Sequence, residues 1–280
     1  MTVKTWFITG ASSGFGRAFA EHALAQGHNV VATARQISAL ASIAAAAPER
    51  VLTLPLDVTR QSDADAAIKA AVARFGRIDV LINNAGYGLV GAFEETSDGE
   101  LRALMDTNFF GAMNVTRAAL PTLRAQKSGA IVNISSLGGQ LSFAGFSAYS
   151  ATKFAIEGVS EAMAQEMAPF GVKVLIVEPG QFRTNLAGPG MRHMPVMEAY
   201  RDVVGSTREF AQRMNGTQEG DPRKAAAVIE AAIDAADTPL RLQLGADAVE
   251  MVRAHGETLL KDLKAWEALA RNTHFDASAL

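Results

Sequence analysis

Short apolar runs alternate with longer amphipathic stretches along most of the chain. The runs are rich in β-branched residues and lie at Trp6–Thr9, Val30–Thr33, Val51–Leu56, Val80–Ile82, Ala130–Ile134, Val172–Val177 and Leu240–Leu244. Stretches with helical spacing lie between them at Gly16–Gln26, Asp63–Phe75, Glu100–Leu123 and Tyr149–Pro169. Apolar strands that alternate with helices are typical of a parallel sheet covered on both faces. The pattern therefore predicts an α/β fold with a doubly wound parallel sheet of about seven strands.

The composition is that of a single globular domain over residues 1–280. Hydrophobic residues make up 49% of the chain and charged residues 20%, which excludes disorder and a coiled coil. A formal charge of −3 gives no general attraction to nucleic acid or to an anionic membrane. No apolar run reaches the ~18–20 residues that span a bilayer. The N-terminal residues lead directly into the first strand without a signal peptide, so we expect a cytoplasmic protein.

Cysteine is absent from the sequence, which excludes disulfides, thiolate nucleophiles and Cys-ligated zinc. The histidines show no metal-ligand spacing, and we expect no metal. The acidic pair Glu94–Glu95 is expected on a solvated helix face. We expect the histidines at the surface or in loops, and they are His22, His28, His193, His255 and His274.

The first predicted strand runs into a glycine-rich turn that a helix follows. In Thr9-Gly10-Ala11-Ser12-Ser13-Gly14-Phe15-Gly16 the glycines have the spacing Gly-x3-Gly-x-Gly. Glycine permits a tight turn and lets the backbone approach a pyrophosphate, while the N–H groups and dipole of a helix start attract phosphate. A glycine-rich turn without a ligand is the alternative, but the strand–helix context favours cofactor binding.

Two further motifs close later strands. The fourth strand ends in Asn83-Asn84-Ala85-Gly86, and the third in Leu56-Asp57-Val58. A strand-end asparagine can instead tie loops together, and an aspartate can cap a turn or helix. With the glycine spacing, these motifs resemble the short-chain dehydrogenase/reductase family, whose fold is Rossmann-like. The resemblance implies that a nicotinamide dinucleotide is held by Gly10, Ser12, Ser13, Gly14, Phe15, Gly16, Asp57, Val58, Asn84, Ala85 and Gly86.

Ser136, Tyr149 and Lys153 form the decisive cluster. Ser136 ends a predicted strand, where open α/β sheets place their ligand crevice. Tyr149 and Lys153 are four residues apart, so they share one face of a helix. A free tyrosine titrates near pH 10, and a neighbouring cation is expected to lower the pKa of Tyr149 toward neutrality. Tyr-x3-Lys alone is common on helices, but its combination with Ser136 and the glycine turn is specific.

The family resemblance assigns a role to each of these residues. It implies that Tyr149 is the general acid/base, that Lys153 also hydrogen-bonds the nicotinamide ribose, and that Ser136 polarises the substrate oxygen. Asn108 matches the residue that holds a water for the proton relay. The resemblance extends from about residue 5 to residue 184. The segment expected to hold the nicotinamide carboxamide contributes Pro179, Gly180, Phe182 and Thr184.

These roles imply an oxidoreductase that transfers a hydride between a nicotinamide and a carbonyl/alcohol pair. A non-catalytic dinucleotide sensor on the same fold is one alternative, but a sensor has no need of a proton-transfer group. An epimerase or dehydratase of the family's extended branch is another. Such proteins are longer and carry Gly-x2-Gly-x2-Gly spacing, which this chain lacks.

The end of the second strand predicts NADPH in preference to NADH. NAD-specific sites place a carboxylate there to bind the ribose 2′-hydroxyl, and this chain has Ala34. The next residue, Arg35, can bind a 2′-phosphate. A solvated surface arginine is the alternative. Ser13 is neutral where many NADP-using relatives carry a base, so use of NAD, as in an NAD-dependent alcohol dehydrogenase, stays open.

The substrate is expected to be an apolar small molecule. The segment Leu186–Gly220, which is rich in Gly, Pro and Met, follows Thr184. We expect it to form a mobile lid over the substrate. A rigid packing insertion is the alternative to the lid. Apolar residues are expected near the crevice, with core packing as their alternative, at Leu89, Val90, Leu141, Phe143 and Phe146.

The expected assembly is a homodimer. In the family, the two long helices that begin near Glu100 and Tyr149 pair across a two-fold axis. A tetramer is the alternative, and it needs the surroundings of the last strand to be free. We expect the helical Val249–Arg271 to cover that surface and so to limit assembly to the dimer.

Overall fold

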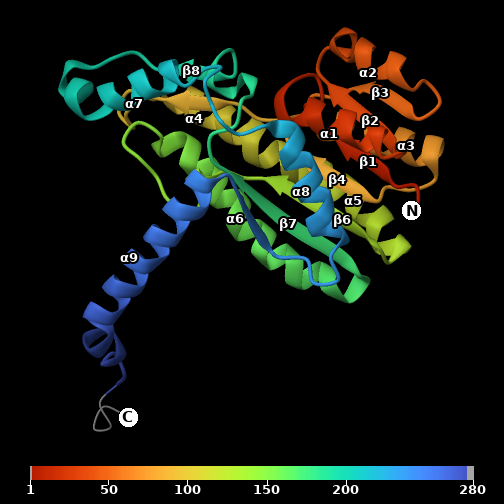
Figure 1. Ribbon diagram of the computed structural model, residues 1–280. Coiled ribbons are helices and arrows are strands. Elements are labelled where there is room, and N and C mark those ends of the chain that lie inside the picture. The colour runs from red at the N-terminus through yellow and green to blue at the C-terminus, as the bar shows by residue number, and fades with distance from the viewer. Residues whose placement is uncertain (1, 276–280) are drawn as a thin grey trace.

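Seven parallel strands form the central sheet of the molecule (Figure 1). The computed structural model describes residues 2–275. The strand order is β3-β2-β1-β4-β6-β7-β9, so the chain builds outward from β1 in one direction and then, from β4, in the other. This confirms the predicted doubly wound, Rossmann-like sheet. The strands are β1 (Thr5–Ile8), β2 (Asn29–Ala34), β3 (Val51–Pro55), β4 (Val80–Asn83), β6 (Gly129–Ile134), β7 (Val172–Pro179) and β9 (Arg241–Leu244).

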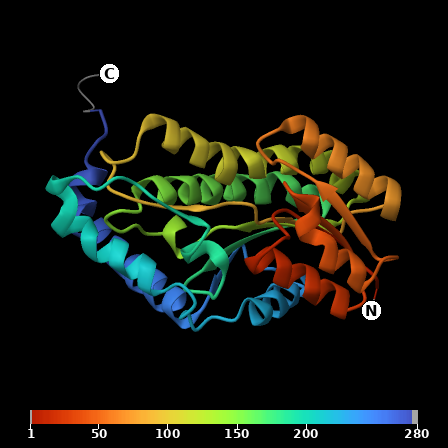
Figure 2. The same ribbon diagram turned by 90° about the horizontal axis from the view of Figure 1, so that it is seen from above.

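Helices cover both faces of this sheet (Figure 2). Side chains alternate between the faces along each strand, as the pleat requires. Trp6 and Ile8 belong to the apolar cluster under α1, α2 and α8, while Phe7 belongs to the cluster under α3, α5 and α6. The helices on the first face are α1 (Gly14–Ala25), α2 (Ala41–Ala46) and α8 (Pro222–Asp234). Those on the second are α3 (Gln61–Phe75), α5 (Gly111–Gln126) and α6 (Ser147–Met167).

The long helix predicted at Glu100–Leu123 is interrupted by a wider turn. It begins as α4 (Asp98–Met105), whose N-cap Ser97 accepts a hydrogen bond from the Glu100 N–H. A π-helical turn, Asp106–Phe110, follows, and α5 continues from it. Such wide turns are frequent at functional sites. Here the turn carries Asn108 into the interior, where the residue is 3% exposed.

The predicted lid segment, residues 186–220, is folded rather than irregular. It contains β8 (Met191–His193) and α7 (Arg201–Arg213), with single 3₁₀ turns at Asn185–Ala187 and Glu198–Tyr200. Strand β8 pairs in parallel with β5 (Gly88–Val90) in a second, two-stranded sheet that the sequence pattern did not predict. Three residues are too short a run to show periodicity. Further 3₁₀ turns lie at Ile37–Leu40, Leu137–Gly139 and Ala168–Phe170.

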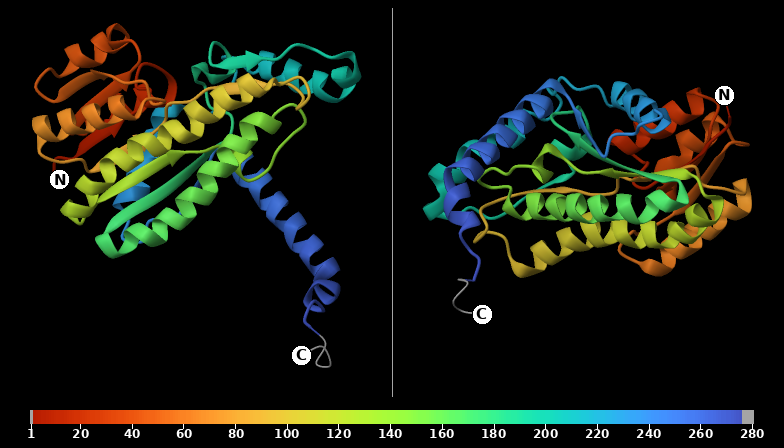
Figure 3. Two further views of the ribbon diagram at one scale, coloured as in Figure 1. Left: turned by 180° about the vertical axis from the view of Figure 1, so that it is seen from behind. Right: turned by 90° about the horizontal axis from the view of Figure 1, so that it is seen from below.

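The last helix, α9 (Ala246–Arg271), extends away from the body of the molecule (Figures 1 and 3). The expectation that it covers the surroundings of the last strand is therefore wrong. Only Ala248, in its first turn, is buried, whereas Leu263 and Trp266 are 61% and 66% exposed. Within residues 2–275, no helix has both the length and the apolar character needed to cross a membrane.

Two polar side chains, of His28 and Glu95, are buried with partners from distant parts of the sequence. His28 is 2% exposed, and its Nε2 lies 2.8 Å from Glu230 Oε1, whose other oxygen lies 2.6 Å from His22 Nε2. The side chain of Glu95 is 1% exposed and forms a 2.6 Å ion pair with Arg208 on α7. The surface prediction for Glu95 was wrong because its partner lies 113 positions away in the sequence. His28 lies in the loop between α1 and β2, as expected for a loop histidine, whereas His22 lies in α1 with a side chain only 13% exposed, contrary to expectation.

Candidate active site

The glycine-rich turn joins β1 to α1 in a conformation that requires glycine. Gly10 and Gly14 have φ values of +65° and +54°, which side chains with a Cβ rarely adopt. A Cβ on Gly16 would overlap the carbonyl oxygen of Gly10 and would lie 2.6 Å from the Asn84 amide nitrogen. The turn therefore packs tightly against the end of β4.

Asn84 ties this turn to the motif after β4. Its Nδ2 donates hydrogen bonds to the carbonyls of Thr9 at 2.9 Å and Gly10 at 3.2 Å. The Thr9 hydroxyl accepts in return from the N–H groups of Asn84 and Ala85, at 2.9 and 3.0 Å. Gly86 leaves room for the neighbouring Asn108, because a Cβ on it would lie 3.0 Å from Asn108 Oδ1. Asn84 thus has the loop-tying role that a strand-end asparagine can have.

The start of α1 fits a dinucleotide pyrophosphate. The N-cap residue Ser13 makes no side-chain capping bond, which leaves the first N–H groups of the helix to an anion. Ser12 and Ser13 are both only partly buried at this turn. Thr184 lies against this turn, since a Cβ on Gly14 would be 3.2 Å from Thr184 Cβ. A backbone cradle of this kind suits a phosphate group.

Ser136, Tyr149 and Lys153 come together at the carboxyl end of β6, as predicted. Ser136 follows the strand, and its Oγ accepts a 3.0 Å hydrogen bond from the Gly138 N–H. Tyr149 lies in the first turn of α6 and Lys153 in the next. The Lys153 ammonium group lies 5.6 Å from the centre of the Tyr149 ring and donates to the carbonyl of Ile134 at 2.8 Å.

Burial reverses the expected direction of the Tyr149 pKa. Removal from water disfavours the phenolate and raises the pKa of Tyr149 to about 12, although hydrogen bonding with Ser136 opposes this. Burial also disfavours the ammonium and lowers the pKa of Lys153 to about 8, which the charge of Glu157 opposes. The expected fall toward neutrality is therefore wrong, because desolvation is the largest influence on this pKa and outweighs the hydrogen bond with Ser136. Tyr149 keeps its proton at neutral pH and can donate it.

Asn108 joins the helix that carries the tyrosine to the motif after β4. Its Nδ2 donates to the Tyr87 carbonyl at 2.9 Å and to Thr152 Oγ1 at 3.2 Å, and its Oδ1 accepts from the Tyr87 N–H at 3.0 Å. The side-chain amide is thus engaged in positioning α6. The role of Asn108 in holding a water stays a prediction.

The residues expected around the adenosine lie at the ends of β2 and β3. Asp57 Oδ1 accepts hydrogen bonds from the Thr59 N–H at 3.0 Å and the Thr59 hydroxyl at 2.7 Å, so Asp57 stabilises a turn. The Thr59 hydroxyl is the main cause that lowers the pKa of Asp57, and the charge of Arg35 adds to it. Arg35 itself is exposed just after β2. Val58 is buried, and its methyl group would collide with a Cβ on Gly111 of α5.

The segment after β7 is fixed by the start of α9. Pro179 pairs with Leu244 in the sheet, and the Gly180 N–H donates to the Leu244 carbonyl at 2.9 Å. The Asp247 carboxylate accepts from the Gln181 N–H at 2.8 Å and occupies the space that a Cβ on Gly180 would need. This contact explains the glycine at position 180.

Phe182 and Thr184 continue that segment toward the glycine turn. The Phe182 ring packs against the Phe15 ring, with centroids 5.1 Å apart. Phe15 is therefore part of the packing under α1, which leaves its N–H as the group that can face a phosphate. Thr184 Oγ1 accepts from the Leu186 N–H at 3.3 Å, so the residue also caps a 3₁₀ turn.

The sequence and fold match known proteins that share this arrangement. The family model for the short chain dehydrogenase matches residues 4–194. The chain is a short-chain dehydrogenase. The family inferred from the motifs is thereby confirmed.

Relatives of this dehydrogenase match over nearly its whole length. Oxidoreductase BOA17 of Botryotinia fuckeliana is 41% identical over 268 residues, which is 95% of this chain and 98% of that protein. A crystal structure of a short-chain dehydrogenase from Streptomyces avermitilis is 53% identical with a TM-score of 0.93, and covers 98% of this chain and 100% of that one. One from Burkholderia phymatum, in complex with NAD, is 26% identical with a TM-score of 0.81, covering 92% and 95%. The chain is accordingly an NAD(P)-dependent enzyme.

Two buried residues on α6 of the dehydrogenase were missed by the sequence analysis. Thr152 accepts the hydrogen bond from Asn108 and donates to the Tyr149 carbonyl at 2.8 Å. Glu157 lies one turn beyond Lys153 and is 5% exposed. The four-residue spacing from Lys153 was the available signal for Glu157, but the strands that bury it cannot be read from that spacing.

The apolar residues expected at the crevice divide into two groups. Leu89 and Val90 are fully buried, so core packing accounts for them. Phe143 is 42% exposed, and the Phe146 ring lies 6.2 Å from the Tyr149 ring, centroid to centroid. Leu141 is partly exposed. Phe146 is thus the one of these residues whose ring lies beside the tyrosine.

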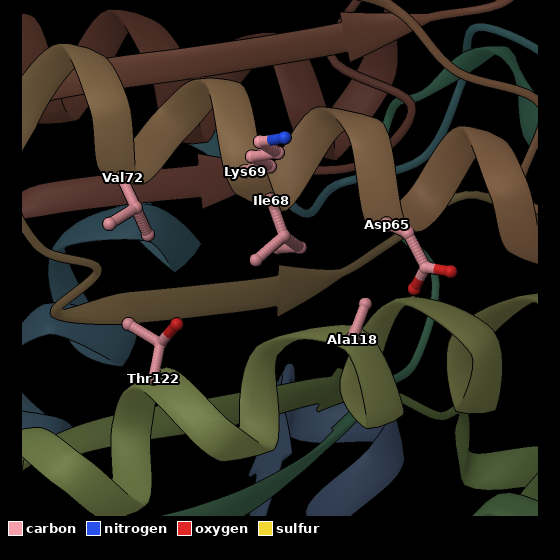
Figure 4. A pocket seen from close by; sticks show the side chains of 6 residues that line it. All are labelled: Asp65, Ile68, Lys69, Val72, Ala118 and Thr122. Atoms are coloured by element: carbon pink, nitrogen blue, oxygen red, sulfur yellow. The ribbon is translucent and has the colours of Figure 1, made fainter.

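A shallow groove between α3 and α5 lies apart from this site (Figure 4). None of the candidate site residues lines it. The side chains of the groove are Asp65, Ile68, Lys69, Val72, Ala118 and Thr122.

Residues 2–275 hold no cluster of three or more acidic or histidine side chains in an arrangement that suits a metal ion.

Proposed function

We propose that this dehydrogenase interconverts a carbonyl and an alcohol, with NADPH as the preferred coenzyme and an apolar small molecule as substrate. The convergence of Ser136, Tyr149 and Lys153 beside the glycine turn carries the proposal. Burial raises the pKa of Tyr149 to about 12, so the phenol holds its proton at neutral pH and has one to transfer. A dinucleotide sensor would not need that donor.

Each of the three side chains has a separate task in the reduction. The hydride comes from the nicotinamide, which is the chemistry that this cofactor supplies when bound. Ser136 donates a hydrogen bond to the carbonyl oxygen and stabilises the charge that develops on it. Tyr149 transfers its phenolic proton to that oxygen, which completes the alcohol. The Lys153 ammonium stabilises the phenolate that Tyr149 leaves.

The coenzyme preference rests on the end of β2. Ala34 offers no carboxylate to a ribose 2′-hydroxyl, and the exposed Arg35 follows it. The influence of Arg35 on the Asp57 pKa indicates that its guanidinium lies near the end of β3 as well. A 2′-phosphate between these strand ends would meet a cation rather than a carboxylate alone.

The lid segment, residues 186–220, is the proposed cover of the substrate. It begins directly after Thr184, which lies against the glycine turn. Its α7 is held to the body by the ion pair between Glu95 and Arg208. Substrate would enter between this segment and the aromatic residues Phe143 and Phe146.

The test is a coenzyme-oxidation assay. The purified protein is incubated with NADPH or NADH and a panel of apolar ketones and aldehydes, and loss of nicotinamide absorbance is followed. We expect turnover with at least one carbonyl and faster turnover with NADPH. Binding of both coenzymes without turnover of any carbonyl or alcohol would favour the sensor.

A further inference from the structure

A carboxylate lies buried behind the catalytic lysine. Glu157 follows Lys153 by one turn of α6, and the two residues are 5% and 8% exposed. Carboxylates are seldom buried this deeply unless they are paired. The roles proposed above for Ser136, Tyr149 and Lys153 make no use of Glu157, so its position needs another explanation.

Side chains from three other elements surround Glu157. Its Oε2 accepts from Arg241 Nε of β9 at 3.0 Å and from Gln140 Nε2 at 3.3 Å. Its Oε1 lies beside the Ser135 hydroxyl, at the point where a Cβ on Gly139 would sit. Gly139 is therefore the residue that leaves room for this pair.

The cluster contains more negative than positive charge. Arg241 also contacts Glu161 at 2.6 Å and Glu178 of β7 at 3.6 Å, so three carboxylates share one guanidinium. Glu178 is fully buried and accepts from Gln140 at 2.9 Å and from Gln243 at 2.7 Å. Lys153 is a second cation buried beside this cluster, and its charge balances part of the excess.

We propose that Glu157 is a positioning residue of the active site, whose carboxylate, held by Arg241 and Gln140, keeps the buried Lys153 ammonium in its charged form. The inference rests on the proposed function only in the role that it gives to Lys153. Glu157 touches neither substrate nor coenzyme and acts through the lysine.

The directions of the two titrations agree with this role. Burial raises the pKa of Glu157 to about 7, with Ser135 and Arg241 opposing the rise. Burial lowers the pKa of Lys153 to about 8, with Glu157 opposing the fall. The charge of Glu157 thus favours the ammonium form of Lys153. Without the carboxylate, Lys153 should lose its proton at lower pH, and activity that needs the ammonium should decline at lower pH.

The test compares Glu157→Gln with Glu161→Gln. Both variants remove one carboxylate that contacts Arg241, but Glu161 is two turns from Lys153 and its side chain is 54% exposed. The titration of Lys153 is followed by NMR of ¹³C-labelled lysine, and the affinity for NADPH and NADH is measured against pH. We expect the Lys153 midpoint and the alkaline loss of coenzyme affinity to fall by about half a pH unit or more in Glu157→Gln. Neither should move in Glu161→Gln.

Ser135→Ala keeps the proposal testable if Glu157→Gln does not fold. Loss of the hydroxyl should raise the pKa of Glu157 and so lower the Lys153 midpoint by a smaller amount. The proposal is overturned if folded Glu157→Gln or Ser135→Ala leaves the midpoint of the Lys153 titration unchanged. It is also overturned if Glu161→Gln shifts that midpoint by the same amount as Glu157→Gln. Neither measurement needs turnover, so a protein that reduces no carbonyl but shows these shifts contradicts the proposed function alone.

Discussion

Lys153 donates a 2.8 Å hydrogen bond to the carbonyl of Ile134, the last residue of β6. This bond holds the second turn of α6 against the strand that leads to Ser136. The ammonium is thereby fixed over the Tyr149 ring by the protein itself. The three side chains are thus preorganised by the fold, which favours catalysis because little rearrangement is needed in the reaction.

Replacing Lys153 with alanine should lower both the affinity for the coenzyme and the rate, because one ammonium serves the ribose and the phenolate. Coenzyme Kd from fluorescence titration and kcat are the two measurements. Lys173→Ala is the control, since Lys173 also donates to backbone carbonyls, of Ile233 and Ala235, but does so away from the site. A change confined to the pH profile would contradict the ribose role of Lys153.

Replacing Arg35 with aspartate should reverse the coenzyme preference. A carboxylate repels the 2′-phosphate and accepts from a 2′-hydroxyl, and a charged contact of about 1.5–3 kcal/mol corresponds to roughly ten- to hundredfold in affinity. The measurement is kcat/KM for NADPH and NADH. Arg271→Asp makes the same charge change on α9, where the side chain is 78% exposed, and should leave the ratio nearly unchanged. If the parent enzyme already prefers NADH, the interpretation of Ala34 and Arg35 as an NADPH-selective strand end is wrong.

The strands and long helices could be predicted from the sequence because their apolar periodicity is local. Each of the seven predicted strands overlaps an observed one, and the motifs placed Ser136, Tyr149 and Lys153 at one end of the sheet. The direction of α9 was not predictable, since an amphipathic pattern gives a helix but not its partner. The pair β5–β8 joins two three-residue runs far apart in sequence, which no local pattern reveals.

The lid segment should exchange its amide hydrogens more slowly when coenzyme and a substrate analogue are bound. Arg208→Met should speed exchange across 201–213, because breaking a buried ion pair costs about 3–5 kcal/mol. Arg213→Met removes an exposed arginine of the same helix and is the control. If coenzyme and substrate analogue leave the amide exchange of the parent segment unchanged, the segment is a rigid packing insertion.

The predicted dimer now rests on α5 and α6, which lie side by side on one face (Figure 3), because α9 does not cover the last strand. Phe110 and Phe154, next to and on these helices, are 51% and 47% exposed. Light scattering should give about twice the chain mass of 29.6 kDa. Phe154→Glu should produce monomers, while Val228→Glu, on α8 of the other face, should not. The mass of four chains would contradict the dimer.

The pKa values of the site show what sequence reasoning could not supply. The i, i+4 spacing correctly placed Lys153 beside Tyr149, but the sign of the Tyr149 pKa shift depends on burial by the surrounding fold. Glu157 was missed for the same reason. The positioning role proposed for Glu157 depends on hydrogen bonds from Arg241 and Gln140, which lie outside α6 and far from Glu157 in the sequence.

Turnover by Tyr149→Phe tests the central claim most directly, because the variant keeps the ring and removes the hydroxyl that carries the transferable proton. Coenzyme-dependent carbonyl reduction and coenzyme Kd are measured for the parent and the variant under the same conditions. The account predicts that turnover is abolished while the Kd stays close to that of the parent. Turnover within about tenfold of the parent, a difference of only about 1.4 kcal/mol in activation free energy, would contradict the assignment of Tyr149 as the proton donor.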